Sequence, residues 1–133
     1  MGVSEGETLN DWRCEVCQNL GGYRSKSFHN HDIPKYLMIK LRRGEMNRQG
    51  IICKRNDKVK PPSTIDITSE EGNLHKYVLC GVITHFGTSM NSGHYICEIN
   101  YRNQWFRCDD ERITQTEFRN FSEEGYGFLF EKA

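Results

Sequence analysis

The segment Lys76–Phe86, which reads Lys-Tyr-Val-Leu-Cys-Gly-Val-Ile-Thr-His-Phe, is the most apolar part of the chain and constrains the fold most. Its β-branched and aromatic residues favour a central strand, because such side chains pack well on a pleated surface. Its apolar stretch, Tyr77–Ile83, is far shorter than the roughly 20 residues of a membrane-spanning helix. The sequence therefore predicts a sheet built around this segment and no transmembrane segment.

Short apolar runs elsewhere predict further strands. Runs bounded by proline, glycine or polar residues are typical of strands in a sheet. They occur at Lys35–Leu41, Gly50–Cys53, Ser63–Thr68, His94–Asn100, Gln104–Asp109 and Tyr126–Glu131. The remainder of the polar stretch Arg42–Pro62 is expected to be a long connection.

One segment, Ile113–Asn120, carries a helix pattern instead. Thr114 and Glu117 have the spacing of a capping box, in which each side chain satisfies a free N–H of the first turn. Ile113 and Phe118 lie where a hydrophobic staple is expected. The predicted fold class is therefore α+β, antiparallel and strand-dominated, with at least one short helix.

Length and composition limit the classes of protein that this chain can represent. With 133 residues it is long enough for one compact domain, which we expect over residues 12–133 after a flexible lead-in at residues 1–11. Eighteen basic and eighteen acidic residues balance, so no overall field attracts nucleic acid or an anionic membrane. The polar N-terminus is unlike a secretory signal. We therefore expect an intracellular protein, cytoplasmic or nuclear, without nucleic-acid or membrane partners.

The segment 94–109 has the pattern of an antiparallel hairpin that turns around Tyr101 and Arg102. That register places His94 opposite Asp109, and opposed Cβ atoms lie about 4.5–5.5 Å apart. The alternate residues of both arms are mostly apolar, and we expect their face to be buried: Tyr95, Cys97, Ile99, Phe106 and Cys108. The opposite face would then present a His–Asp pair at the open end of the hairpin.

A histidine held by an aspartate is the base and orienting part of a nucleophilic triad. The carboxylate selects the tautomer and stabilises the imidazolium, while the imidazole activates a thiol or hydroxyl. The alternative is a hydrogen bond that only stabilises the hairpin. A shift of one residue in the assumed register would reverse the faces, so spacing alone leaves both interpretations open.

Several stretches, in order along the chain, resemble the ubiquitin-specific protease family. Ser92-Gly93-His94-Tyr95 and the segments around it resemble the family's histidine box, and Tyr126–Glu131 resembles its closing strand. The histidine box also includes Tyr77–Gly87 and Trp105–Asp110; Trp12–Cys17 resembles the second C-x-x-C of the fingers region, and Ile33–Arg43 a strand with a Leu-Lys-Arg-Phe-like end. The resemblance implies a papain-like cysteine protease fold, with a fingers remnant at about 12–31 and a palm sheet at about 33–131.

The resemblance also implies a role for each matching residue. His94 would be the catalytic base, Asp109 the third member of the triad, and Asp110 a supporting polar residue near the oxyanion site. Tyr95 and His85 would line the channel for the ubiquitin tail, and Gly93 would let the substrate backbone approach closely. The implied activity is a deubiquitinase that hydrolyses isopeptide bonds to ubiquitin through a thiol, with ubiquitin or a ubiquitinated protein as partner.

Two departures from the family pattern bear on that activity. These residues contain no Gly-x-x-Cys-Tyr-like sequence, which carries the nucleophile of the family near the start of a helix. Cys80, Cys97 and Cys108 lie in strand patterns typical of core packing, and Cys53 has no helix start behind it. The second departure is Gly44, where the family usually has phenylalanine.

Cys14 and Cys17 are the candidate metal ligands, although no cofactor is expected in catalysis. A closed structural zinc site needs four ligands, and three interpretations are open. The pair is half of a Cys₄ site whose other half lies on another segment, or it recruits His29 and His31, which share a face in an H-x-H strand, or it binds no metal.

Three functions are compatible with these observations. The first is an isopeptidase whose nucleophilic half comes from a missing N-terminal part or another chain. The second is a catalytically inactive ubiquitin-binding or regulatory remnant, and the third is a small zinc-binding interaction domain over residues 12–31. In the first two, a sheet face that lacks its helical cover would be an exposed apolar patch.

Overall fold

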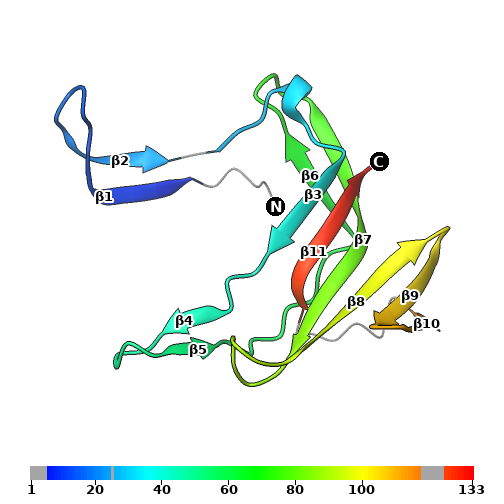
Figure 1. Ribbon diagram of the computed structural model, residues 1–133. Coiled ribbons are helices and arrows are strands. Elements are labelled where there is room, and N and C mark those ends of the chain that lie inside the picture. The colour runs from blue at the N-terminus through cyan, green and yellow to red at the C-terminus, as the bar shows by residue number, and fades with distance from the viewer. Residues whose placement is uncertain (1–5, 25, 118–124) are drawn as a thin grey trace.

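The computed structural model describes residues 6–24, 26–117 and 125–133. These residues form a seven-stranded antiparallel sheet and two separate two-stranded sheets (Figure 1). In chain order the elements are β1 (Glu7–Arg13), β2 (Leu20–Arg24), η1 (Asn30–Asp32), β3 (Tyr36–Lys40), β4 (Gly44–Met46), β5 (Ile52–Lys54), β6 (Thr64–Thr68), β7 (Leu74–Phe86), β8 (His94–Tyr101), β9 (Gln104–Asp109), β10 (Arg112–Thr116) and β11 (Gly125–Lys132). Among them, no helix has the length and apolar character needed to cross a membrane.

The thirteen-residue strand β7 is the centre of the large sheet, as its apolar sequence predicts. Its first half pairs with β6 and its second half with β8, while β11 runs along its other edge. The strand order is β10-β9-β8-β7-β11-β3. In Figure 1 the hairpins beyond β8 extend away from the centre of the sheet, and the β1–β2 and β4–β5 hairpins project on the other side.

The hydrophobic core lies on one face of this sheet and consists of rows of opposed side chains. Leu79 is opposite Phe130, which is opposite Leu37, and the next row is Val82, Phe128 and Ile39. The fully buried members of the core are Ile67, Tyr77, Leu79, Val82, Trp105, Phe128 and Phe130. Phe28, Ile33 and Val59, from outside the large sheet, pack against them. The core thus joins the loops to β7 and its neighbours.

The opposite face of the sheet is rich in exposed apolar side chains. Met38 and Ile99 belong to one row across the sheet, and both are exposed. The exposed apolar residues on this face include Tyr36, Met38, Val78, Tyr95, Ile99, Tyr101 and Ile113. An uncovered apolar face is therefore a feature of these residues, as expected for a sheet without its helical cover.

Most predicted strands are confirmed, including those around β3, β5, β6, β7 and β11. The helix predicted at 113–120 is wrong over Ile113–Thr116, which form β10; residues 118–120 lie outside the described residues. The capping-box spacing is overridden because β10 pairs with β9, placing Ile113 opposite Cys108 and Thr114 opposite Arg107. Ile113, Thr114 and Thr116 are β-branched and fit this strand.

Two segments in the first half of the chain contain strands that the sequence did not predict. Residues 7–11 of the predicted lead-in 1–11 belong to β1, whose Glu7, Thr8 and Leu9 pair with β2; residues 1–5 are not described. The long connection after β3 contains a second strand, β4, which pairs with β5. Gly44 begins β4 beside Ile52 and Met90, so a glycine is accommodated there without a gap in the pairing.

Candidate active site

The β8–β9 hairpin forms as predicted, but its turn lies one residue further along the chain. Tyr101 pairs with Gln104, so the two-residue turn is Arg102–Asn103, and both residues have positive φ, 51° and 63°. Two-residue hairpin turns of this type favour asparagine, which tolerates a left-handed backbone. The Asn103 signal in the sequence therefore marks the true position of the turn, and the predicted register is wrong by two residues.

His94 and Asp109 nevertheless meet at the open end of the hairpin. The ladder pairs Cys97 with Cys108, so its continuation places Ile96 opposite Asp109 and His94 one diagonal step away. Diagonal neighbours on the same face lie within reach of long side chains. His94 Nε2 is 2.5 Å from Asp109 Oδ1. A shift of two residues preserves the face, which is why the predicted contact exists despite the wrong register.

The prediction about which face of the hairpin is buried is wrong. The buried face is the one that carries His94 and Asp109, where Glu98 is 1% and Trp105 8% exposed. Glu98 is opposite Val82 of the core, and its Oε1 accepts hydrogen bonds from the Arg107 guanidinium at 3.0 and 3.2 Å. This pairing makes a buried carboxylate possible on the core side. The predicted apolar face is only partly covered, and its Tyr95, Ile99 and Tyr101 side chains are exposed.

Nearby carboxylates favour the charged form of His94. The hydrogen bond to Asp109 raises the pKa of His94, and the negative charges of Asp109 and Asp110 add to the increase. Side-chain ligand atoms of these three residues lie within 4.8 Å of one another. A raised folded-state pKa stabilises the fold most below the unfolded histidine pKa, and this contribution is lost as the pH rises through the raised value.

The three predicted substrate-side residues lie next to one another, but they differ in exposure. His85 pairs with Tyr95 across β7 and β8, and their ring centroids are 4.7 Å apart. Tyr95 is 52% exposed, whereas His85 is 3% exposed. Gly93 has φ 148°, and a Cβ there would lie 2.5 Å from His85 Nε2. His85 therefore packs beside the Gly93 backbone and the Tyr95 ring, and its own ring offers almost no surface to a substrate.

The loop 87–93 that leads into His94 is held by a residue that the sequence analysis did not identify. Lys54 of β5 donates hydrogen bonds from Nζ to the carbonyl oxygens of His85 and Gly87, both at 2.8 Å. The side chain of Met90 packs close to Gly44 of β4. Both contacts join the β4–β5 hairpin to the loop. A lysine and a methionine in polar segments give no sequence signal for such contacts.

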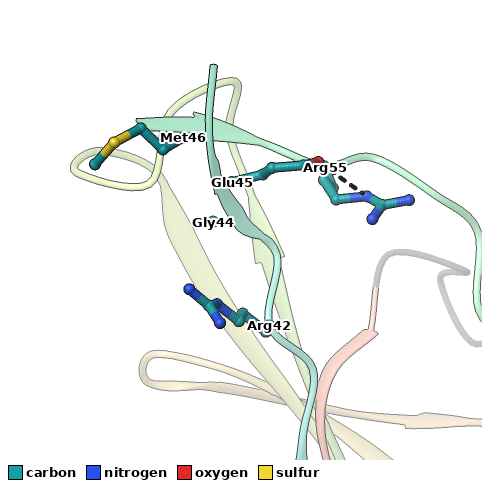
Figure 2. Close-up of a pocket in the computed structure, with 5 residues that line it drawn as sticks. All are labelled: Arg42, Gly44, Glu45, Met46 and Arg55. Atoms are coloured by element: carbon teal, nitrogen blue, oxygen red, sulfur yellow. Dashed lines mark ion pairs between the residues drawn. The ribbon is translucent and has the colours of Figure 1, made fainter. Parts of the chain in front are cut away.

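The β4–β5 hairpin itself is held by charged side chains around an open pocket. Figure 2 shows Glu45 beside Arg55, while Met46 points away from them. The distance from Arg55 Nε to Glu45 Oε2 is 3.7 Å, and the same nitrogen is 2.7 Å from Asp57 Oδ2. The buried guanidinium of Arg43 donates to the carbonyl oxygens of Gly125, Arg55 and Asp57. This arginine anchors the base of the hairpin to the beginning of β11.

Cys14 and Cys17 lie in the turn that joins β1 to β2. Backbone N–H groups of Cys17 and Val16 donate to the Cys14 sulfur and lower the pKa of its thiol. Within the described residues, these two cysteines do not cluster with a third possible ligand. The described residues therefore do not bring His29 and His31 together with this cysteine pair.

The two histidines make other contacts. His29 lies 3.1 Å from Glu71 and 3.3 Å from Glu70, and His31 lies 3.4 Å from Asp32. The donor set is thus two sulfurs, and the thiol pKa of one of them, Cys14, is lowered. It fits half of a tetrahedral zinc site but does not complete one.

The other four cysteines lie in strands, and none is at the start of a helix. Cys53 is exposed in β5, while Cys80, Cys97 and Cys108 are partly buried in β7, β8 and β9. Burial raises the pKa of the Cys80 and Cys97 thiols. A nucleophile needs a thiolate, so these two cysteines have the opposite of the required environment. The described residues thus place His94 in contact with Asp109, while burial keeps the thiols of Cys80 and Cys97 from activation.

Comparison with known proteins identifies the family. A model of the ubiquitin carboxyl-terminal hydrolase family matches residues 3–130. The chain is 30% identical over 135 residues to ubiquitin carboxyl-terminal hydrolase 16 of Arabidopsis thaliana, and 33% identical over 126 residues to hydrolase 23 of the same plant. The chain therefore belongs to the ubiquitin carboxyl-terminal hydrolase family, which confirms the resemblance found in the sequence.

The fold is also that of solved members of this class. The yeast SAGA DUBm has a TM-score of 0.74 at 22% identity, over 98% of this chain and 31% of that chain. A SAGA DUB module bound to monoubiquitin has a TM-score of 0.71 at 21% identity, again over 98% of this chain and 31% of that one. The two plant relatives are matched over 96% and 90% of this chain, which spans 13% and 14% of their lengths.

Replacing Asp109 with asparagine is expected to lower the pKa of His94 towards the ordinary value of 6.5. An amide oxygen still accepts a hydrogen bond but carries no charge to stabilise the imidazolium. An NMR titration of the His94 imidazole measures the change. Asp110→Asn is the matched control and should lower the pKa less, because it removes only a long-range charge. An unchanged pKa in Asp109→Asn would show that the contact is not formed in solution.

Lys54→Met is expected to speed amide hydrogen exchange in residues 87–93 by roughly tenfold, because a hydrogen bond to a charged group contributes about 1.5 kcal/mol or more. The substitution keeps the aliphatic stem and removes the ammonium that holds two carbonyl groups. Lys60→Met changes an exposed lysine of the same connection and serves as the control. Equal exchange in both variants would contradict a role for Lys54 in holding the loop.

Proposed function

We propose that this chain supplies the histidine–aspartate half of a thiol isopeptidase that hydrolyses bonds to ubiquitin. The 2.5 Å contact between His94 Nε2 and Asp109 Oδ1 is the observation that carries the proposal. Membership of the ubiquitin carboxyl-terminal hydrolase family supports the reaction class. The nucleophilic thiol would come from residues outside this sequence, in the same polypeptide or in another chain.

The contact determines which nitrogen of His94 would act as the base. With Nε2–H donating to Asp109, the lone pair is on Nδ1. The side chains of His94 and Asp109 are 47% and 40% exposed, so the imidazole is open to an incoming group. In this geometry Nδ1 takes the proton of the thiol, and the carboxylate stabilises the resulting imidazolium. The raised pKa of His94 favours this thiolate–imidazolium pair.

The proposed reaction then proceeds by acyl transfer. The thiolate attacks the carbonyl carbon of the isopeptide bond, and His94 gives its proton to the departing lysine amine. His94 next takes a proton from water, which hydrolyses the thioester and releases the ubiquitin carboxylate. Asp110 would be a supporting polar residue near the oxyanion site. Tyr95 and Gly93 would face the substrate, with His85 supporting both.

Ubiquitin as the acyl group is supported by the structural likeness to a SAGA DUB module whose structure contains monoubiquitin. That likeness is at 21% identity and supports the fold. The open backbone of Gly93, next to the exposed ring of Tyr95, would suit a thin extended chain such as a glycine-rich tail.

A chimera tests the proposed role. Residues 3–130 replace the matching segment of Arabidopsis thaliana ubiquitin carboxyl-terminal hydrolase 16, and hydrolysis of a fluorogenic ubiquitin amide is measured. His94→Ala is expected to lower kcat by about 10²–10⁴-fold, which is the range for general acid–base catalysis. His31→Ala, on an exposed histidine far along the chain from the hairpin, is the matched control and should retain activity.

Two outcomes of the chimera experiment would contradict the enzymatic role. One is hydrolysis that His94→Ala leaves unchanged. The other is a folded chimera that binds ubiquitin without turnover while the parent enzyme is active. The latter result would support the regulatory, ubiquitin-binding function, which is favoured by the lack of a Gly-x-x-Cys-Tyr-like sequence in these residues.

We also propose that Cys14 and Cys17 are two of the four ligands of a structural zinc ion, with the other two from a segment outside this sequence. The lowered pKa of the Cys14 thiol supports this role, because zinc binds the thiolate. Zinc would supply no catalytic chemistry at this position. It would fix the turn between β1 and β2, which has few apolar contacts of its own.

Titration of the reduced chain with Co²⁺ tests the metal ligands, because thiolate coordination produces a charge-transfer absorption band. Cys14→Ser and Cys17→Ser should each abolish most of the band, while Cys80→Ser, on a partly buried thiol of β7, should leave it unchanged. A band that survives the loss of Cys14 would assign the metal to other residues. With two ligands from the chain, binding should be weak and sensitive to competing chelators.

A further inference from the structure

Cys97 and Cys108 are directly opposed on neighbouring strands, one row away from the His94–Asp109 pair. Cys97 of β8 pairs with Cys108 of β9 in the hairpin ladder. The row continues to Ile83 on β7 and to Ile113 on β10, so the two thiols lie between isoleucines on the sheet face opposite the core. Neither the proposed reaction nor the zinc site uses them.

The register brings the two sulfurs within reach of a covalent bond. Because the turn has two residues, Tyr101 and Gln104 form a hydrogen-bonded pair. Hydrogen-bonded and non-hydrogen-bonded pairs alternate along an antiparallel ladder, so Cys97–Cys108 is also a hydrogen-bonded pair. The Cα atoms of such a pair are about 5.5 Å apart. Disulfides form across Cα distances of about 4.4–6.8 Å. Opposed Cβ atoms are about 4.5–5.5 Å apart, and hydrogen-bonded pairs lie at the longer end of this range. The strands must therefore approach by roughly 1 Å or more to reach the usual Cβ distance of a disulfide.

Two further observations fit thiols that can react with each other. Both side chains are partly exposed, and the sheet face around them carries the uncovered apolar residues Ile99 and Ile113, so a small oxidant has access. Burial raises the pKa of Cys97, and the negative charge of a neighbouring Cys108 thiolate raises it further. That second contribution arises because the two sulfurs are close.

We propose that Cys97 and Cys108 form an oxidative modification site, at which hydrogen peroxide converts the two thiols to a cross-strand disulfide. The inference goes beyond the proposed isopeptidase function, and the bond itself does not depend on that function. The substrate is a peroxide small enough to reach a half-buried pair. The product is a hairpin whose two arms are joined beside His94 and Asp109.

The reaction balances with one peroxide and no other reactant. One thiolate attacks an oxygen of the peroxide and breaks the O–O bond, giving a sulfenic acid and, with a proton, water. The second sulfur then attacks the sulfenic sulfur, the S–O bond breaks, and the oxygen leaves as a second water. The attacking sulfur reacts as the thiolate, and the raised pKa of Cys97 lowers the thiolate fraction of that residue.

The bond would act on the proposed active site through the backbone. Asp109 follows Cys108 directly, and His94 lies three residues before Cys97 on the same hairpin arm. Drawing the strands together by roughly 1 Å beside this pair changes the diagonal reach between His94 and Asp109. A disulfide that departs from relaxed geometry is also easily reduced, so the modification is reversible by thiols.

Peptide mapping of the intact, reduced chain after treatment with hydrogen peroxide tests the bond. Thiols that have not reacted are blocked with N-ethylmaleimide before trypsin digestion. Trypsin separates residues 77–102 from 108–112, and their linked mass should equal the sum less two hydrogen atoms. Dithiothreitol should abolish the linked peptide. Cys14 and Cys17 share another peptide, residues 14–24, so a disulfide between them cannot be mistaken for this one.

Matched variants identify the sulfur atoms, because residues 77–102 also contain Cys80. Cys80→Ala should keep the linked peptide, whereas Cys97→Ala and Cys108→Ala should each abolish it. Circular dichroism checks that each variant is folded. The unmodified chain gives an independent measurement in which Cys97 and Cys108 lose reactivity with N-ethylmaleimide together, while Cys80 does not follow them.

Three results would overturn the proposal. One is peroxide treatment that leaves Cys97 and Cys108 separately oxidised or reactive, without the linked peptide. Another is a linked peptide that persists in Cys97→Ala. The third is a bond between two molecules, which a mixture of ¹⁵N-labelled and unlabelled chains would reveal as linked peptides of mixed isotope content. None of these readouts requires isopeptidase activity, so the two proposals can fail independently.

Discussion

The pairing of β7 with three other strands is the constraint on which the rest of the structure depends. β7 is long enough to pair with β6 along its first half and with β8 along its second half, while β11 follows its other edge. Its buried side chains form the centre of the core. Because Phe86 pairs with His94 at the end of this strand, the same pairing that buries the core also determines where the imidazole begins β8.

The site combines a rigid side with an open side. On the sheet face opposite the core, His85 packs beside Gly93 and Tyr95, and on the core face Glu98 is held by Arg107. Towards solvent, the His94–Asp109 pair is about half exposed. An incoming thiol would therefore meet a base whose orientation is already fixed by the sheet. Under the proposed function, this division would let preorganised groups act without reorganisation when the thiol approaches.

The loop 87–93 before His94 is held by the β4–β5 hairpin, which is not part of the large sheet. Lys54 and the β4–β5 hairpin hold its first residues, and Arg43 anchors that hairpin to β11. The cysteine pair on the other side of His94 belongs to the hairpin ladder itself. The His94 imidazole thus lies between the loop that Lys54 holds and the Cys97–Cys108 row of its own sheet. A change in either would alter the position of the imidazole relative to Asp109.

The sequence by itself determined the large strands, the hairpin and the face shared by His94 and Asp109, because apolar content and the two-residue period of a strand are local properties. Residues near Asn103 also carried a turn signal that marks the correct register. Only the tertiary structure decided that residues 113–116 form a strand, that the Glu98 face is buried, and that Lys54 holds the loop. These three features depend on pairing with β9, on the core beneath β8 and on a hairpin distant in sequence, and such long-range contacts override local propensity.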